Sequence, residues 1–104
     1  MAIQTNTREA TLAAVKLNLR IAHSALDAEL EEQIEACLAD LAVCGIADPD
    51  ETDPLILGAI KLWCRREFTD DTDAASAYLK RYDAQKGCLQ MAAGYGGEPA
   101  DVAD

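Results

Sequence analysis

The residues of this chain that could do chemistry are its carboxylates, four cysteines and one histidine. Three aspartates in a proline-containing segment, Asp48, Asp50 and Asp53, resemble the start of a calcium-binding loop. Counted from Asp48, such a loop needs glycine at its sixth position and a bidentate glutamate at its twelfth. Asp53 and Ala59 stand at those positions, so the sequence does not predict calcium binding.

The cysteines occur singly along the chain, without the closely spaced pairs that are typical of zinc sites. They are Cys37, Cys44, Cys64 and Cys88. The first three lie among apolar residues at helical spacing, a pattern that favours buried free thiols acting as small hydrophobic side chains. We therefore expect neither structural zinc nor a disulfide framework.

The remaining motifs do not predict an enzyme. His23 lies in a predicted turn, and Arg20 stands where the Glu-x-x-His motif of di-iron bundles has glutamate. Residues 94–97 (GYGG) follow a predicted helix, whereas a phosphate-binding loop follows a strand. Acid–base catalysis needs a carboxylate in a pocket, but the acidic residues here fall on a solvated helix face. We expect no catalytic residue, no metal site and no cofactor.

Charge is segregated along the chain. Its 104 residues include 9 Lys and Arg against 19 Asp and Glu, for a net charge of −10. Residues 21–60 hold no Lys or Arg, while most of the bases follow this segment. The acids of that segment are Asp27, Glu29, Glu31, Glu32, Glu35, Asp40, Asp48, Asp50, Glu51 and Asp53. This balance argues against a basic surface that binds nucleic acid or anionic membrane.

The chain also carries no signal for a membrane or for export. No apolar run approaches the length of a bilayer span. Residues 1–10 lack a basic region followed by an apolar stretch, so we expect no signal peptide and synthesis in a reducing cytoplasm.

Helical periodicity predicts the fold class: all-α, a small antiparallel bundle of about four helices with a flexible C-terminal tail. The first, short helix is expected to begin at a cap on Thr7 or Thr11 and to end by Arg20. The second is expected to begin at Ser24, with Asp27 as its capping-box partner, and to end at Gly45. Its apolar stripe is the clearest in the chain: Leu26, Leu30, Ile34, Cys37, Leu38, Leu41 and Cys44.

The later segments complete the predicted bundle. Asp53 and Pro54 are typical of an N-cap and first helical residue, and residues 55–68 are apolar on nearly all sides, which favours a central helix. The last helix is expected over residues 74–93. We therefore predict one helical domain over residues 1–93 and a flexible tail over residues 94–104, which contains three glycines.

Four groups of segments also carry a family resemblance. They are residues 12–21 (LAAVKLNLRI), residues 26–30 (LDAEL) leading into 34–37 (IEAC), residues 53–56 (DPLI) with Ala59 and Ile60, and residues 82–86 (YDAQK) running to 91–95 (MAAGY). In this order, from residue 10 to residue 95, the chain resembles the small head-tail connector proteins of long-tailed bacteriophages, the adaptors directly below the portal. Trp63 and Phe68, near the end of the third predicted helix, also fit this family.

The resemblance implies a structural virion protein at the head-tail interface, made in the host cytoplasm. Its subunits would form a ring of about twelve copies around the DNA channel, or remain monomers until the portal protein assembles them. The ring would help to retain packaged DNA and offer a docking surface to a tail completion or terminator protein. It also makes the tail residues Tyr95, Gly96 and Gly97 candidates to order against the portal. Tyr95 could instead pack on the last turn of its own helix.

The candidate surface residues follow from the charge. Asp27, Glu31 and Glu35 repeat every four positions, and each such pair of like charges costs a few tenths of a kcal/mol. This row is either a solvated face that keeps the protein soluble, or a face turned toward the channel or a neighbouring subunit. The basic candidates for the opposite side of a subunit contact are Arg65, Arg66, Lys80 and Arg81.

Two functions are consistent with these features. An acidic collar would repel the DNA backbone, so that DNA passes through without specific binding. The alternative is a small acidic interaction protein, such as a DNA mimic or an inhibitor that occupies the basic site of a nucleic-acid enzyme.

Overall fold

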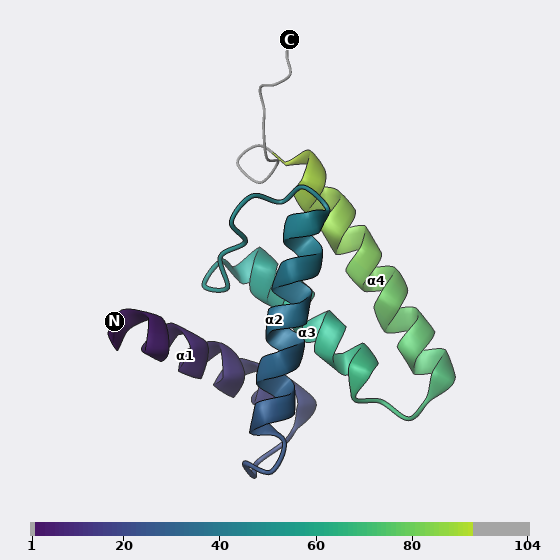
Figure 1. The fold of residues 1–104 in the computed structure, drawn as a ribbon. Coiled ribbons are helices and arrows are strands. Elements are labelled where there is room, and N and C mark those ends of the chain that lie inside the picture. Colours follow the sequence, from purple (N-terminus) through teal and green to yellow (C-terminus); the bar gives the residue numbers. More distant parts are fainter. Residues whose placement is uncertain (1, 93–104) are drawn as a thin grey trace.

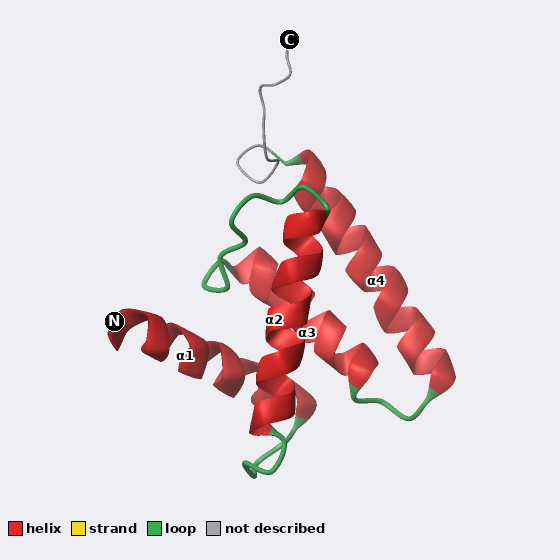
Figure 2. Ribbon diagram, viewed as in Figure 1, coloured by secondary structure: helices red, strands yellow, loops and turns green. Residues whose placement is uncertain are grey.

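The structure, a computed structural model, describes residues 2–92 of the chain, with side chains from residue 7 onward. It contains four helices: α1 (Ala2–Leu19), α2 (Asp27–Val43), α3 (Pro54–Glu67) and α4 (Thr72–Met91) (Figures 1 and 2). No β-strand occurs among these residues, so the predicted all-α bundle of four helices is confirmed. The predicted tail, residues 94–104, lies outside the described part of the chain.

Helix α3 is the centre of the fold, as its lack of a polar face predicts. It packs against each of the other three helices, most extensively against α4. In Figure 1 it crosses behind α2, and the chain turns back after it into α4. Its inward residues are fully or almost fully buried: Ile56, Ala59, Ile60 and Cys64. Together with Leu30, Ile34, Cys37 and Leu41 of α2, they form most of the hydrophobic core.

The predicted start of α1 is wrong. The helix begins at Ala2 rather than at a cap on Thr7 or Thr11, and both threonines lie inside it. The Thr11 hydroxyl donates to the Thr7 carbonyl at 3.0 Å, within the same helix. A threonine bonded to the carbonyl four residues back is compatible with a helix interior, and no glycine or proline interrupts residues 2–19.

The predicted cap of α2 at Ser24 is also wrong. The residue at the N-cap position is Leu26, and no side chain caps the helix. Instead the Ser24 carbonyl accepts from the Asp27 amide at 3.2 Å. The end of the helix agrees with the prediction, because Gly45 follows it with a φ of 99°, a conformation that glycine adopts without a Cβ clash.

The boundaries of α3 and α4 lie close to those expected. The Asp53 carboxylate accepts from the Leu55 amide at 2.8 Å, and Pro54 opens α3, as predicted. Helix α4 begins at Thr72, two residues before the predicted start, because the Asp71 carboxylate accepts from the amides of Asp73 and Ala74. It ends at Met91.

Candidate interaction surfaces

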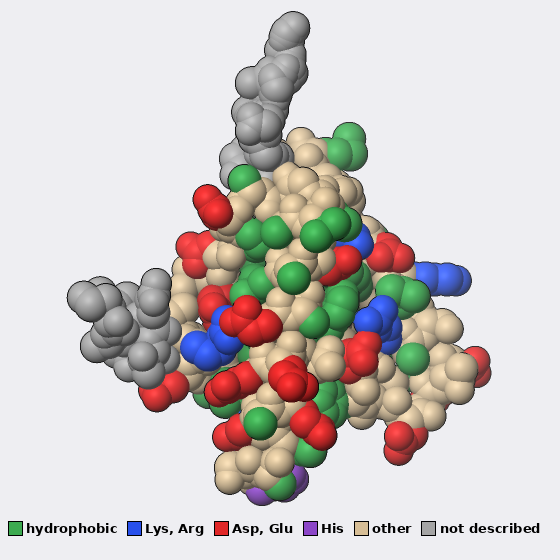
Figure 3. Space-filling model, viewed as in Figure 1, with side chains coloured by type: hydrophobic (Ala, Val, Ile, Leu, Met, Phe, Trp, Pro, Cys, Tyr) green, Lys and Arg blue, Asp and Glu red, His purple; other side chains and the backbone are tan. Residues whose placement is uncertain are grey.

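The acidic side chains in the first half of α2 lie on the outside of the molecule. From here on, the acidic row means all five of them, the three predicted members together with Glu29 and Glu32. Glu29, Glu31, Glu32 and Glu35 are exposed and Asp27 is half-buried. In Figure 3 acidic side chains gather over the lower half of α2, and apolar side chains lie over its upper half. The dipole at the start of the helix stabilises the two of these carboxylates that lie in its first turn, Asp27 and Glu29. The row is therefore available to solvent or to a partner.

Two acids of α2 are neutralised by lysines from other helices. Lys16 of α1 forms an ion pair with Asp27 at 2.8 Å, and Lys86 of α4 forms one with Asp40 at 3.0 Å. Glu29, Glu31 and Glu32 make no ion pair with any side chain described from residue 7 to residue 92. These three carboxylates are the uncompensated part of the row.

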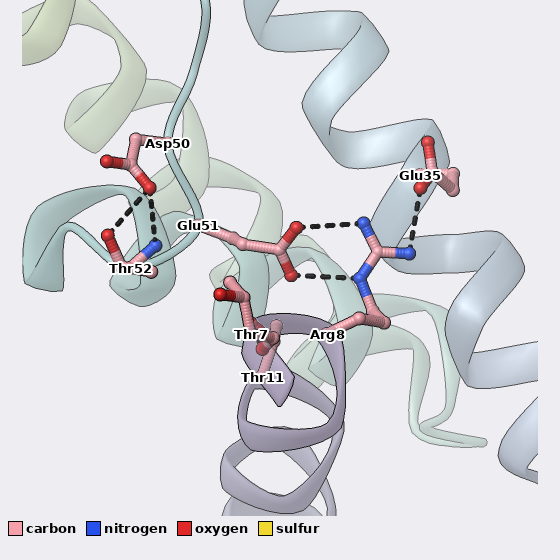
Figure 4. A network of polar contacts seen from close by, with 7 residues as sticks. All are labelled: Thr7, Arg8, Thr11, Glu35, Asp50, Glu51 and Thr52. Carbon is pink, nitrogen blue, oxygen red and sulfur yellow. Dashed lines mark hydrogen bonds and ion pairs between the residues drawn. The ribbon is translucent and has the colours of Figure 1, made fainter. Parts of the chain in front are cut away.

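Glu35 belongs to a second cluster, which joins α1, α2 and the loop before α3 (Figure 4). Arg8 donates to both carboxylate oxygens of Glu51, at 2.8 and 2.9 Å, and lies 2.7 Å from a Glu35 oxygen. The Arg8 and Glu51 side chains are 23% and 15% exposed, so their pair is shielded from water. We call Arg8, Glu51 and Glu35 the arginine clasp. It ties α1 to the rest of the fold.

The clasp shifts the titration of its members. The hydrogen bond from Arg8 lowers the pKa of Glu51 below its ordinary value, and burial only partly opposes this. The same bond raises the pKa of Arg8, which stays charged throughout. Since the charged form of Glu51 is favoured in the folded protein, the clasp contributes stability above the carboxylate's ordinary pKa and loses it in acid.

A third polar cluster lies between α2 and α4. The Tyr82 hydroxyl donates to Asp40 Oδ2 at 2.6 Å, and Cys37 Sγ donates to that hydroxyl at 3.8 Å. Burial alone would raise the pKa of Asp40, but the hydrogen bonds from Tyr82 and Lys86 outweigh it and lower that pKa. Burial, followed by the bond to Asp40, raises the pKa of Tyr82. These partners satisfy the polar atoms, which indicates a structural role.

Two of the four predicted basic interface residues are engaged within the subunit. Arg65 donates to Asn18 Oδ1 at 2.7 Å, to the Asn18 carbonyl at 3.1 Å and to the Tyr78 hydroxyl at 2.9 Å. Arg66 pairs with Glu67 and stacks over the Trp63 ring, 4.7 Å from its centroid. The fold uses both guanidinium groups to join helices or cover an aromatic ring, and a contact to another subunit would need to share them.

The other two basic candidates, Lys80 and Arg81, are exposed on α4. Neither forms an ion pair with a side chain that the structure describes. Arg81 also lines a shallow groove with Lys61 and Arg65, and no acidic residue lines it. Of the four basic candidates, the two that remain free for a partner are therefore both on α4.

An acidic groove lies between α2 and the end of α3. Glu29, Glu32 and Gln33 line one wall, and Glu67, Phe68 and Asp70 line the other. Arg66, which pairs with Glu67, partly neutralises its edge. No base lines the groove itself, so it would favour a positively charged partner.

The sequence predicted the acidic row but not the clasp and the Tyr82 cluster. Arg8 and Glu51 are 43 residues apart, and Tyr82 and Asp40 are 42 apart. The one available signal in the sequence was that residues 21–60 contain acids but no base. A base from outside that segment, such as Arg8, was therefore needed to pair with its carboxylates. Tyr95, Gly96 and Gly97 lie outside the described residues, and their role stays a prediction.

The described residues contain neither a cluster of metal-ligating side chains nor a membrane-spanning helix. Over residues 2–92 no group of three or more His, Cys, Asp or Glu side chains could hold a metal ion. Within the same range no helix is long and apolar enough to cross a membrane.

Comparison with protein-family models, with curated proteins and with solved structures gives no match to this chain.

The thiols differ sharply in accessibility. All four are free; Cys37 and Cys64 are fully buried and Cys88 is exposed. Burial raises the pKa of Cys37 and that of Cys64 to about 12. Because the thiolate is the reactive form, we expect Cys88 to react with an aromatic disulfide reagent at pH 8 within minutes. Cys37 and Cys64 should react only after denaturant is added.

Mass spectrometry of the labelled peptides measures this order directly. Labelling of Cys37 or Cys64 as fast as Cys88 in the folded protein would contradict the described core.

Proposed function

We propose that the chain is a structural subunit of a bacteriophage head-tail connector, which assembles as a ring below the portal and extends the DNA channel. The observation that supports it most is the uncompensated acidic row of α2, where Glu29, Glu31 and Glu32 are exposed without ion pairs among the described side chains. The segment order of the sequence supports the same proposal.

The physical basis is repulsion between like charges. Each subunit contributes a net charge of −10, and a ring concentrates these charges around one axis. DNA carries one phosphate charge for about every 1.7 Å of its length. A channel with an acidic lining offers DNA no basic contact to hold it, so the genome slides instead of binding. The ring would retain DNA by closing its path together with the portal and the tail protein.

The direct experiment is to mix the purified chain with the portal protein encoded in the same genome and to examine the sample by electron microscopy. We expect a ring of this protein on the narrow end of the portal. A chain that stays monomeric and never binds portal or tail components would contradict the proposal.

A charge reversal tests the acidic row itself. We expect the double substitution Glu29→Lys and Glu31→Lys, at two of the uncompensated acids, to reduce the yield of infectious particles at least about tenfold. The reversed charges would attract DNA where the row faces the channel, and would repel the bases of a neighbouring subunit where the row faces that subunit. The measurement is complementation of a phage that lacks the gene. Glu9→Lys with Asp73→Lys, two exposed acids on other helices, is the control with the same change in charge. Unchanged yield with the row reversed would instead support a solvated face without a further role.

The acidic groove between α2 and α3 favours a second candidate, a small acidic protein that inhibits a nucleic-acid enzyme. Its four carboxylates, from Glu29, Glu32, Glu67 and Asp70, could occupy a phosphate-binding site. Capture of a single DNA-binding enzyme from host lysate, lost on Glu29→Lys with Glu32→Lys, would favour this function over the connector.

A further inference from the structure

The outward side of α2 has a defined pattern. Its fully buried residues mark the inward side of the helix. Because successive residues are rotated by about 100° around the helix axis, the residues on the opposite, outward side can be identified from the sequence. That side begins with an alanine, continues with glutamates in the middle and ends with small and apolar residues. Its members are all exposed: Ala28, Glu31, Glu32, Glu35, Ala39, Ala42 and Val43. We call this set the α2 outer face.

Helix α4 carries the matching pattern with the opposite charge. Tyr82 and Leu89 are its buried residues, and the side opposite them is exposed. That side opens with Asp73 in the first turn. From residue 77 onward it has an alanine, then two bases, then small residues and a large apolar one. We call it the α4 outer face: Ala77, Lys80, Arg81, Ala84, Cys88 and Met91.

One constant shift of 49 residues superposes the two faces. It pairs Ala28 with Ala77 and the Glu31–Glu32 dyad with the Lys80–Arg81 dyad. Further along, it sets Glu35 opposite Ala84 and Ala39 opposite Cys88, and it places Met91 opposite Ala42, next to Val43. Beyond the dyads, the small side chains of Ala39, Ala84 and Cys88 let the two helices approach closely, and the charge dyads then meet across the contact. Val43 is 85% exposed and Met91 88%, so both large apolar side chains lack cover in the isolated subunit.

The charges of both dyads are unused. Within residues 7–92, none of Glu31, Glu32, Lys80 and Arg81 forms an ion pair with a described side chain. Opposite charges at matching positions favour one partner and one register, while two copies of the same face would repel. The pattern therefore fits the α4 outer face of a second copy rather than an unrelated surface.

The direction of the helices suits this contact. Within one subunit Tyr82 contacts Asp40 at 2.6 Å and Gln90 contacts the Cys44 carbonyl at 2.7 Å. The contact later in α4 is made with the residue later in the sequence on the α2 side, so α2 and α4 run in the same direction, as Figure 1 shows. Rotation about an axis near that direction keeps them parallel in neighbouring copies. A two-fold axis across the helices would make them antiparallel and break the pairing.

We infer that the α2 outer face binds the α4 outer face of a second copy as a parallel helix pair, with Glu31 and Glu32 against Lys80 and Arg81. Each subunit presents its α2 outer face to one neighbour and its α4 outer face to the other, so the contact is head-to-tail. Such contacts generate a closed ring when the rotation between neighbouring subunits divides a full turn evenly. This inference rests on the proposed connector ring and identifies the surfaces that build it.

Cysteine cross-linking tests the contact and its direction. The shift of 49 residues places Ala39 opposite the native Cys88. With copper phenanthroline as oxidant, we expect Ala39→Cys to form intermolecular disulfides that appear as a ladder of dimers, trimers and larger species. The matched control, Ala39→Cys with Cys88→Ser, should give at least about tenfold less linked product, since a disulfide needs both sulfurs within bonding geometry. Glu9→Cys, an exposed position on α1, should behave like that control.

Charge exchange tests the same contact without a covalent bond. In sedimentation at 50 mM salt, self-association should be lost in Glu31→Lys with Glu32→Lys, and lost in Lys80→Glu with Arg81→Glu. Combining all four substitutions, or mixing the two variants, should restore it. Circular dichroism reports whether each variant keeps its helices.

The outcomes separate the inference from the proposed function. A cross-linked ladder together with rescue by the fourfold variant supports the inference. Linkage that stops at dimers, or equal linkage in the controls, overturns it. A ring that forms on the portal despite absent linkage overturns only the inference, whereas a linked ladder with no portal binding argues against the connector function.

Discussion

Replacement of Ile60 by alanine is expected to destabilise the fold by about 2–5 kcal/mol. Ile60 is fully buried in α3, the helix on which the other three pack. Removing its methyl and ethyl groups leaves a cavity that three surrounding helices cannot all close at once. For a domain of this size, a loss of 3 kcal/mol lowers the unfolding midpoint by about 12–24 °C.

Chemical denaturation followed by circular dichroism at 222 nm measures this effect. Leu17→Ala is the control, because Leu17 is 80% exposed and its truncation should change the free energy of unfolding by less than about 0.5 kcal/mol. An equally small change for Ile60→Ala would mean that α3 is not the centre of the core. The described packing would then be wrong.

The sequence was sufficient for the fold class because each helix has its own local signal. The stripe of α2 contains all four of its fully buried residues, Leu30, Ile34, Cys37 and Leu41. The Asp53–Pro54 pair and Gly45 mark boundaries through backbone chemistry that needs no tertiary contact. For the same reason, the apolar segment that became α3 could be expected at the centre.

The starts of α1 and α2 could not be predicted with the same rules. A threonine can cap a helix or bond back inside it, and the free-energy difference between these roles is small. Thr11 takes the second role. Ser24 uses its carbonyl in a turn, so Leu26 precedes α2 without a side-chain cap.

The candidate surfaces were predictable in charge but not in pairing. Ten acids without a base between residues 21 and 60 predict an acidic face. Which of these acids lack an ion pair depends on where α1 and α4 cross α2, because those two helices carry the bases that reach it. That crossing brings Arg8 to Glu35 and Lys86 to Asp40, and it leaves Glu31 and Glu32 free. No local pattern encodes such distances.

Substitution of Arg8 by methionine tests the arginine clasp and should lower the free energy of unfolding by about 2 kcal/mol at pH 7. The value lies between those of exposed and buried ion pairs, as the partial burial of Arg8 and Glu51 requires. Methionine keeps most of the aliphatic volume, so the loss reflects the two hydrogen bonds to Glu51 and the contact with Glu35. Lys16→Met should cost less than half as much, because Lys16 contacts the single carboxylate of Asp27 whereas Arg8 contacts two carboxylates.

The pH dependence of that loss identifies its cause. The folded protein holds the pKa of Glu51 below its ordinary value of 4.5 because Arg8 donates to it. Its contribution is therefore fully present above about pH 5 and disappears as the pH falls through the lowered pKa. The difference in unfolding free energy between wild type and Arg8→Met should be constant from pH 5 to 7 and shrink toward pH 3. Asp40 keeps its own partners in both proteins, so its titration cancels in the difference. A difference that stays constant down to pH 3 would assign the loss to packing of the arginine side chain rather than to the clasp.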